Sequence, residues 1–220
     1  MEKRLPSLTA AEPNDASPFV PESRSLSHLR EAAAGCRGCH LWRRATQTVF
    51  GEGLKRARVM MVGEQPGDRE DREGKPFVGP AGRELDKALE AVGIDRRDVY
   101  ITNVVKHFSF EERGKRRLHK TPKRFEIDAC RPWLDAELQS VDPEALVVLG
   151  ATAGKALLGS GFKITQMRGR VLESDLAPIV AATIHPSAIL RQRDDESRHA
   201  ERLAFTRDLE QIASVLNARS

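Results

Sequence analysis

The sequence has few of the features that mark membrane, secreted or disulfide-rich proteins. No run of about eighteen apolar residues occurs, so no membrane-spanning helix is expected. The first 25 residues lack the apolar stretch of a secretory signal, and their Pro, Ser, Ala and acidic content predicts a disordered tail before a single domain of residues 26–220. Only three cysteines are present, an odd number that argues against a disulfide framework. Together these absences predict a cytoplasmic protein.

Positive charge is also scarce outside one segment. The chain of 220 residues has a formal net charge of only +4, yet residues 113–124 hold seven Lys and Arg and no acid. The remaining chain holds 29 basic residues against 32 acidic residues and is therefore slightly acidic. Such a focused patch is typical of a surface that binds a polyanion.

Apolar runs alternate with amphipathic segments along most of the chain. Four runs predict buried strands, and amphipathic patterns predict helices between them. One helix is expected over residues 121–141, with Thr121 as its N-cap and Pro122 at its first position, and a final helix over about residues 196–216. Residues 169–174 predict a small strand or hairpin. The fold class expected is α/β, a three-layer α/β/α sandwich around a mostly parallel, four-stranded sheet. The four predicted strand runs are residues 57–63, 98–106, 145–150 and 179–184.

Polar motifs follow three of the predicted strands. GEQPGD follows the first, TNVVKH ends the second, and HPS follows the fourth. Because ligands of such sheets bind beyond the carboxyl ends of the strands, the three motifs should meet at one edge.

The cysteines indicate a metal site. Cys36 and Cys39 have the C-x-x-C spacing that lets two thiolates chelate one centre, and Cys130 supplies a third thiolate. The candidates for a fourth ligand are the histidines at 40, 107, 119 and 185. Spacing alone does not choose between zinc and an iron–sulfur cluster, and unligated thiols remain an alternative.

Five motifs in order resemble one family. GEQPGDREDREGKPFVGPAGRELD and HPSAILR resemble the two signature motifs of the uracil-DNA glycosylase superfamily in its iron–sulfur, family 4 form. CRGCHLW and DACRPWL resemble its cluster-binding segments. GEQPG together with KRRLHKTP is similar to the UdgX branch, whose members excise uracil and become covalently attached to DNA through a loop histidine. The similarity covers about Ser27 to the C-terminus.

The resemblance implies an iron–sulfur cluster, most simply [4Fe-4S], with a structural role. Family 4 members carry a cysteine where this sequence has His107, in TNVVKH. The implied ligands are therefore three thiolates and one imidazole, and the alternative is a histidine beside a three-cysteine site. These ligands are Cys36, Cys39, His107 and Cys130.

The resemblance also implies a pocket for a flipped uracil. Phe77 is expected to stack on the base, unless it is a core residue, and Asn103 to bind uracil O4 and N3–H, unless it caps a strand end. His185 is expected to donate a hydrogen bond to uracil O2 as the base leaves. Gln65 is expected in the pocket wall. Glu64 and Asp68 are the candidates for the carboxylate that stabilises the sugar cation, and the sequence does not separate their roles.

His119, inside the basic segment, is the implied nucleophile. A neutral imidazole that reaches C1′ before water would give a stable adduct and a single turnover. The alternative is a histidine that hydrogen-bonds phosphate. The residues expected to contact the DNA backbone are Lys115, Arg116, Arg117, Lys120, Ser187 and Arg191.

Three other functions compete with this one. They are a conventional multiple-turnover glycosylase of family 4, a non-catalytic iron–sulfur protein that binds nucleic acid, and a zinc-binding structural module. The partner expected is uracil-containing DNA, single-stranded in preference to double-stranded. No membrane partner is expected, and the protein is expected to be a monomer.

Overall fold

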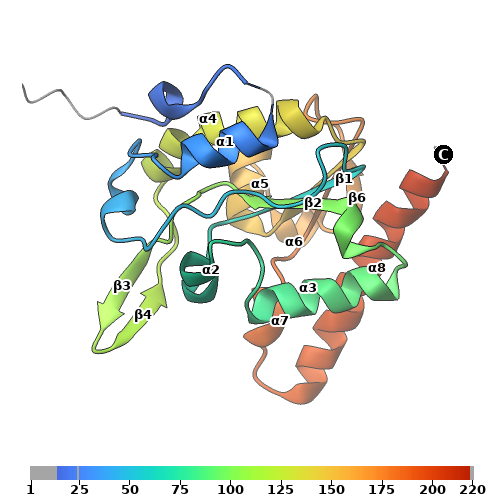
Figure 1. Ribbon diagram of the computed structural model, residues 1–220. Coiled ribbons are helices and arrows are strands. Elements are labelled where there is room, and N and C mark those ends of the chain that lie inside the picture. The colour runs from blue at the N-terminus through green and yellow to red at the C-terminus, as the bar shows by residue number, and fades with distance from the viewer. Residues whose placement is uncertain (1–13, 24, 219–220) are drawn as a thin grey trace, which may run out of the picture.

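A twisted five-stranded sheet lies at the centre of the protein, whose computed structural model describes residues 14–23 and 25–218 (Figure 1). The strand order is β2-β1-β5-β7-β6. Four strands are parallel, and β6 runs antiparallel to β7, so the sheet has one strand more than the sequence predicts. The extra strand is one of the two alternatives expected for residues 169–174. The strands are β1 (Val59–Gly63), β2 (Val99–Asn103), β5 (Ala145–Leu149), β6 (Arg170–Leu172) and β7 (Ile179–Thr183).

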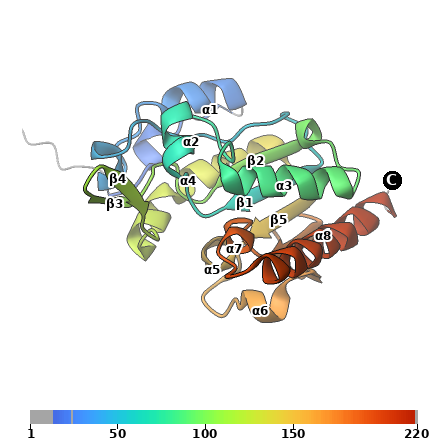
Figure 2. The same ribbon diagram turned by 90° about the horizontal axis from the view of Figure 1, so that it is seen from below.

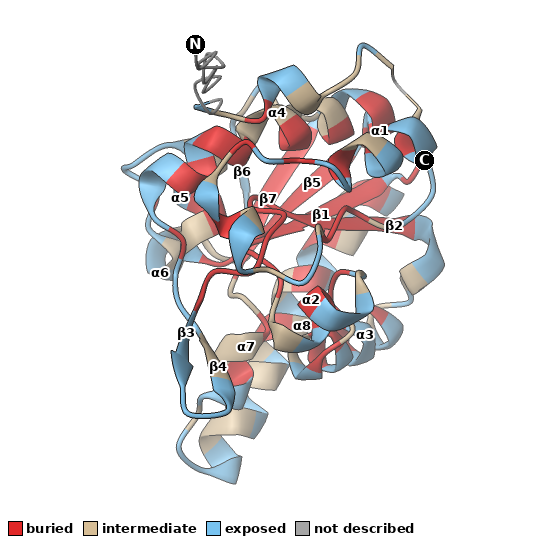
Figure 3. Cartoon of the chain, turned by 60° about the vertical axis from the view of Figure 1, so that its left-hand side comes forward, coloured by how far each residue is buried: buried red, intermediate tan, exposed pale blue. Residues whose placement is uncertain are grey.

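Helices cover both faces of the sheet, which confirms the three-layer α/β/α fold (Figure 2). Side chains alternate along each strand, so that Met60 packs with Trp133 on one face while Met61 packs with Phe205 on the other. The first face is covered by α1 (Leu26–Ala33), α4 (Arg124–Val141) and α5 (Ala151–Leu158). The second is covered by α3 (Pro80–Ala91) and α8 (Asp195–Asn217). The four parallel strands are buried throughout (Figure 3).

Shorter elements connect these layers. Three of them, α2, η2 and α7, lie beside the motifs singled out in the sequence. The shorter helices are η1 (Ser17–Phe19), η2 (His40–Arg43), α2 (Asp68–Glu73), η3 (Arg96–Asp98), α6 (Ile164–Met167) and α7 (Ser187–Leu190). Among the described residues, no helix combines the length and apolar character needed to cross a membrane.

The first part of the basic segment, up to His119, lies in a β-hairpin. β3 (Phe110–Arg113) and β4 (Arg116–His119) pair in antiparallel register, with Phe110 opposite His119. The two-residue turn contains Gly114 at φ 61°, a left-handed conformation that glycine adopts without strain. The hairpin forms a separate two-stranded sheet at one end of the molecule (Figure 1).

The helix after the hairpin begins later than the sequence predicts. Its N-cap is Lys123 in place of Thr121, and Arg124 is its first residue in place of Pro122. The reason is that the Glu126 carboxylate accepts the Lys123 N–H at 2.5 Å, which satisfies a free donor at the helix start.

Part of the predicted tail lies outside the described residues. Within the described part, Ala16 is 1% exposed and its N–H donates to the Ala129 carbonyl of α4 at 2.8 Å. This backbone contact joins the segment around Ala16 to the helix that carries Cys130. The boundary drawn at residue 26 stays a prediction.

Candidate active site

The carboxyl ends of β1, β2 and β7 bring several predicted pocket residues together. Glu64 follows β1, Asn103 ends β2 beside Gly63, and His185 comes two residues after β7. Gly63 leaves the room that its neighbours occupy, because a Cβ there would lie 2.5 Å from Asn103 Oδ1 and 2.7 Å from the Phe77 ring. The motif glycine is therefore part of the pocket's shape.

Phe77 is held beside His185 by a strained loop. Its ring is 7% exposed and its centroid lies 5.6 Å from that of His185. Its φ of 55° is unusual for a bulky residue and costs about 1–3 kcal/mol. Two features offset this cost. Gly82 leaves room for the Phe77 carbonyl, because a Cβ at position 82 would lie 1.6 Å from its oxygen. The Glu70 carboxylate also accepts the Gly79 N–H at 2.7 Å.

Asn103 has a buried atom without a partner. The residue is 2% exposed, and its Oδ1 accepts no hydrogen bond from any described residue. A buried amide oxygen without a hydrogen bond costs about 1–3 kcal/mol, so a ligand N–H that reaches Oδ1 would remove this cost.

His185 is a neutral imidazole that can donate from Nε2. The Ser187 N–H lies 3.2 Å from His185 Nδ1, and a backbone N–H can only donate, so Nδ1 carries the lone pair. The proton is thereby assigned to Nε2. Burial is the main reason that the pKa of His185 is lowered to about 4, and the neighbouring Arg191 and His119 contribute to the same shift.

Glu64 and His119 lie side by side, although Glu64 follows β1 and His119 belongs to the hairpin. His119 Nε2 lies 3.4 Å from Glu64 Oε1, and this oxygen is buried without a hydrogen bond from the described residues. The His119 side chain is 50% exposed, and the Glu64 side chain is 20% exposed. Of the two candidate carboxylates, Glu64 is the one that contacts the histidine.

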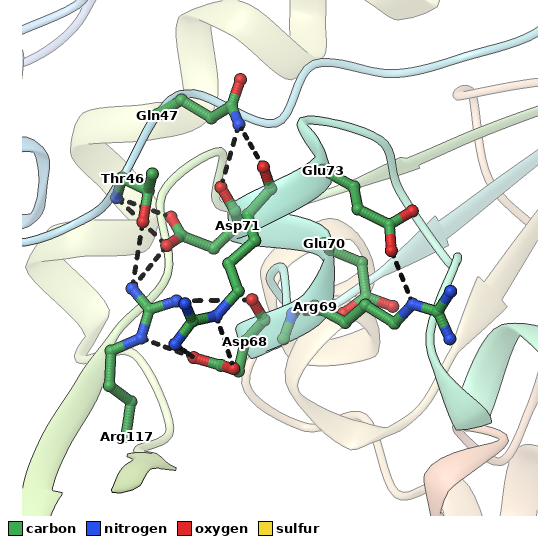
Figure 4. Close-up of polar contacts among 10 residues, drawn as sticks. Thr46, Gln47, Asp68, Arg69, Glu70, Asp71, Glu73 and Arg117 are labelled. Carbon is green, nitrogen blue, oxygen red and sulfur yellow. Dashed lines mark hydrogen bonds and ion pairs between the residues drawn. The ribbon is translucent and has the colours of Figure 1, made fainter. Parts of the chain in front are cut away.

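Asp68 and Arg117 anchor the hairpin (Figure 4). Arg117 donates to Asp68 and to the fully buried carboxylate of Asp71, and its guanidinium lies 5.5 Å and 5.0 Å from the ring centroids of Phe108 and Phe110. The Arg117 side chain is only 14% exposed. The sequence predicts that Arg117 contacts the DNA backbone, whereas in the structure it binds carboxylates of α2. Asp68 is engaged by that ion pair and by Arg72.

The amide of Gln65 is saturated by the stem of the same hairpin. Its Nε2 donates to the carbonyls of Ser109 and Lys120 at 3.1 and 3.0 Å, and its Oε1 accepts the Ser109 N–H at 2.9 Å. The side chain predicted for the pocket wall thus supports the segments on either side of the hairpin, because its donors and acceptor are already engaged.

The other predicted DNA contacts lie in two places. Lys115, Arg116 and Lys120 are exposed on the hairpin and directly after it. Arg191, at the end of α7, donates to Ser187 Oγ at 2.8 Å, and that hydroxyl also lies 2.8 Å from His185 Nδ1. Ser187 therefore orients His185, while the exposed Arg191 borders the pocket.

The three cysteines lie near one another, with Cys36 and Cys130 buried and Cys39 half-buried. Burial raises the pKa of the Cys130 thiol to about 12, and its neighbours Cys39 and Cys36 contribute to the rise. Two sulfurs accept N–H groups, Cys36 from the Trp133 indole and Cys130 from the backbone of Lys106, both at 3.2 Å. Among the described residues, no three His, Cys, Asp or Glu side chains lie as close together as a single metal ion requires.

The candidate fourth ligands are spread over the fold. His107 is 4% exposed and its Nε2 lies 3.0 Å from the Thr48 hydroxyl, which donates its own proton to the Ala33 carbonyl. Nε2 of His107 is therefore the donor, and Nδ1 carries the lone pair. His40 is paired with Glu126 at 3.2 Å, His119 contacts Glu64, and His185 lies beside Phe77.

Two residues that support the site are not predicted from the sequence. Glu70 joins the two ends of the pocket loop by accepting the N–H groups of Gly67 and Gly79. The sequence does contain a pattern that indicates this role, because a glutamate three residues after a helix N-cap is typical of a capping box. Gly150, at φ 93°, lets His185 approach, since a Cβ there would lie 2.9 Å from the Cβ of His185.

Comparisons with known proteins place the chain in one family. A family model for the uracil DNA glycosylase superfamily matches residues 50–210. A type-4 uracil-DNA glycosylase of Sulfurisphaera tokodaii is 39% identical over 176 residues, which cover 76% of this chain and 76% of that protein. One of Thermotoga maritima is 39% identical over 171 residues, covering 77% of this chain and 85% of the relative. One of Pyrobaculum aerophilum is 36% identical over 174 residues, covering 76% and 85%.

Proposed function

Because this chain belongs to the uracil DNA glycosylase superfamily, we propose that it repairs DNA by cleaving the bond between uracil and C1′ of the deoxyribose. The observation that carries the proposal is the unpartnered oxygen of Asn103 in a pocket shared with His185 and Phe77. That oxygen can accept the N3–H of uracil while the amide N–H₂ donates to O4. Cytosine presents the opposite pattern, so the amide favours uracil.

His185 assists the departure of the base. When the glycosidic bond breaks, its electron pair leaves with uracil, and negative charge grows on O2. The Nε2–H of His185 donates to that oxygen, and Ser187 fixes the ring through Nδ1. Removing a single preorganised donor of this kind costs about 10²–10³ in rate.

His119 captures the sugar cation in place of water. The imidazole lone pair forms a bond to C1′, and the ring becomes a cation that the Glu64 carboxylate, 3.4 Å away, neutralises. The half-exposed position of His119 on a hairpin anchored to α2 supports this role. The product is one protein molecule bound to one DNA strand. Exposed Lys115, Arg116 and Lys120 hold the phosphates of that strand, which is single-stranded in this proposal.

The cysteines and His107 fit an iron–sulfur cluster. Cys36 and Cys130 accept N–H groups from Trp133 and the Lys106 backbone, as thiolate ligands do, and Nδ1 of His107 keeps its lone pair. Cys39 would supply the remaining bond. When bound, the cluster would act as a covalent brace. These residues would then join the N-terminal segment to α4 and to the end of β2.

A denaturing gel tests the central step. The protein is incubated with single-stranded DNA containing one uracil, heated in SDS and separated by size. A slower band that contains both protein and DNA is expected, together with one released uracil per protein molecule. His119→Ala is expected to lose the band.

The type-4 relatives favour a second candidate, the conventional enzyme with multiple turnovers. It predicts free abasic DNA in excess of the protein and no slower band, and that outcome would overturn covalent capture while preserving base excision. An absorption band near 400 nm, together with iron and sulfide analysis, tests the cluster separately. A colourless protein that contains zinc would overturn it.

A further inference from the structure

Beside the hairpin, an aromatic ring is exposed at the start of α4. Phe125 is 53% exposed, and it is the only aromatic side chain among the large exposed hydrophobic residues of the described chain. It occupies the second position of the helix. The first turn is capped there, because the buried Glu126 accepts the Lys123 N–H at 2.5 Å. The exposed face of this ring does not contribute to the hydrophobic core.

A second ring and a cation border Phe125. The His40 ring, from η2, has its centroid 5.6 Å away at an interplanar angle of 31°, and its side chain is 51% exposed. The same Glu126 carboxylate holds His40 Nε2 at 3.2 Å. Lys123 Nζ lies 5.8 Å from the centroid of the Phe125 ring. The rings therefore form a tilted, partly open surface beside a positive charge.

The charge around this surface suits a nucleic-acid strand. Within the described chain, no carboxylate is paired with Lys115, Arg116, Lys120 or Lys123. The hairpin's own acids, Glu111 and Glu112, lie on β3, and Glu112 is paired with Arg44 at 3.6 Å. Lys123 is the cation beside the ring, and the other three lie on the hairpin and directly after it. Proteins bind single strands with such a combination, in which cations hold the phosphates and an aromatic ring stacks on a base.

We propose that Phe125 is a stacking platform, edged by His40, for an unpaired base that lies near the uracil in the same DNA strand. The inference rests on the proposed function, which places the uracil sugar at His119. Phe125 follows His119 by six residues, so their Cα atoms are at most about 20 Å apart, given about 3.6 Å per extended residue. A strand held at His119 reaches Phe125 within a few nucleotides. Figures 1 and 2 show the hairpin and the N-terminal end of α4 at the same end of the molecule.

The platform contributes to affinity without reading the sequence, because every base has a stacking face. It also favours single strands. A base stacked on Phe125 is unpaired, whereas the same base in a duplex is held by its partner and neighbours. The ligand class is thus single-stranded DNA that extends beyond the uracil nucleotide on one side.

A base-deletion series tests the platform. The probe is a fluorescent single strand whose uracil carries a 2′-fluoro-arabino sugar, which resists cleavage because fluorine destabilises the sugar cation. Seven probes are compared, one intact and six lacking a single base at one of the three positions on either side. For the wild-type protein, one deletion is expected to weaken binding by about tenfold or more, the usual effect of one lost stack.

Variants of Phe125 test whether this residue causes the sensitivity to the missing base. Phe125→Ala should bind the intact probe about tenfold more weakly and lose its sensitivity to that deletion. Phe125→Leu, which keeps an apolar contact, should behave like the alanine variant, and Phe125→Trp like the wild type. Leu203→Ala removes a similarly exposed side chain (48%) from α8 and should change nothing. Identical deletion profiles in the wild type and in both the alanine and leucine variants would overturn the platform.

The same proteins separate this inference from the proposed function. Uracil release is measured on ordinary uracil-containing DNA at saturating concentration. Release by the wild type without any dependence of binding on Phe125 overturns the platform alone. Binding that depends on Phe125 without release of uracil overturns the proposed activity alone.

Discussion

Arg117 of the hairpin and Asp71 of α2 form an ion pair in which Nη1 lies 2.6 Å from a carboxylate that is fully buried. Replacing Arg117 with methionine keeps most of the apolar stem and leaves the buried Asp71 without its cationic partner. We expect Arg117→Met to lower the free energy of unfolding by about 2–3 kcal/mol, below the range for a fully buried pair because Arg117 is partly exposed. Urea titration measures this loss.

The same variant should affect capture more than excision. The hairpin carries His119, whereas Asn103 and His185 lie on the main sheet's carboxyl edge. Adduct formation by Arg117→Met should therefore slow by about 100-fold, roughly 2.7 kcal/mol of barrier, and uracil release by much less. Arg207→Met, on the exposed side of α8, is the control and should leave both steps nearly unchanged. Equal losses in both steps would contradict a hairpin that positions the nucleophile alone.

Gly63→Ala should close the pocket. The new Cβ would lie 2.5 Å from Asn103 Oδ1 and 2.7 Å from Phe77, so one of these side chains has to move. We expect uracil release to fall by about 100-fold, because misplacement by about 1 Å has effects of that size. Gly161→Ala, where a Cβ meets nothing within 4 Å, is the matched control. Unchanged release by Gly63→Ala would show that the pocket does not depend on Asn103 and Phe77.

His185 should stay neutral far into the acid range. Burial lowers its pKa from 6.5 to about 4, so its ring signals in NMR of histidine-labelled protein should titrate near pH 4, with the proton on Nε2 above that pH. The peaks are assigned by their loss in His185→Gln. Since the unfolded chain takes up this proton first, His185 lowers stability progressively as pH falls from about 6.5 to about 4. A ring that titrates near pH 6.5 in the folded protein would contradict the burial argument.

Salt should weaken binding through the hairpin's cations. Three phosphate contacts to a single strand predict a slope near −2 for log K against log salt. The double substitution Lys115→Gln and Lys120→Gln should make the slope shallower by about 1.4. Lys55→Gln with Arg56→Gln removes the same charge shortly before β1, at the opposite edge of the sheet, and should leave the slope unchanged. Equal slopes for the wild type and both double variants would place the phosphates elsewhere.

The sequence predicts the sheet and the edge where the pocket lies because both depend on local patterns. Four apolar runs become four parallel strands, and the motifs that follow them meet, as the pairing of Gly63 with Asn103 shows. The family resemblance adds roles for individual residues, but it does not reveal their partners. Gln65 and Arg117 are polar residues in motifs, and only the folded chain shows that Ser109, Asp68 and Asp71 occupy them.

The hairpin escapes prediction for a physical reason. Its strands are four residues long and carry mostly charged side chains, so they lack the apolar alternation that reveals a strand. What stabilises the hairpin is long-range. Arg117 reaches residues of α2 that are 46 and 49 positions away in the chain, and Gln65 lies 44 positions from Ser109. Such contacts leave no trace in any short window of sequence.

The separate two-stranded sheet has a consequence for how the chain could be altered. The residues proposed for base recognition and the proposed nucleophile lie on different units, connected through Ser109 and Lys120 at the hairpin's stem. The hairpin is thus a unit that could be exchanged separately. A short turn that joins those two residues directly would leave the framework of the proposed uracil pocket in place. The hairpin itself could be transplanted to a related glycosylase with multiple turnovers, provided that a helix of that protein carries carboxylates to pair with Arg117.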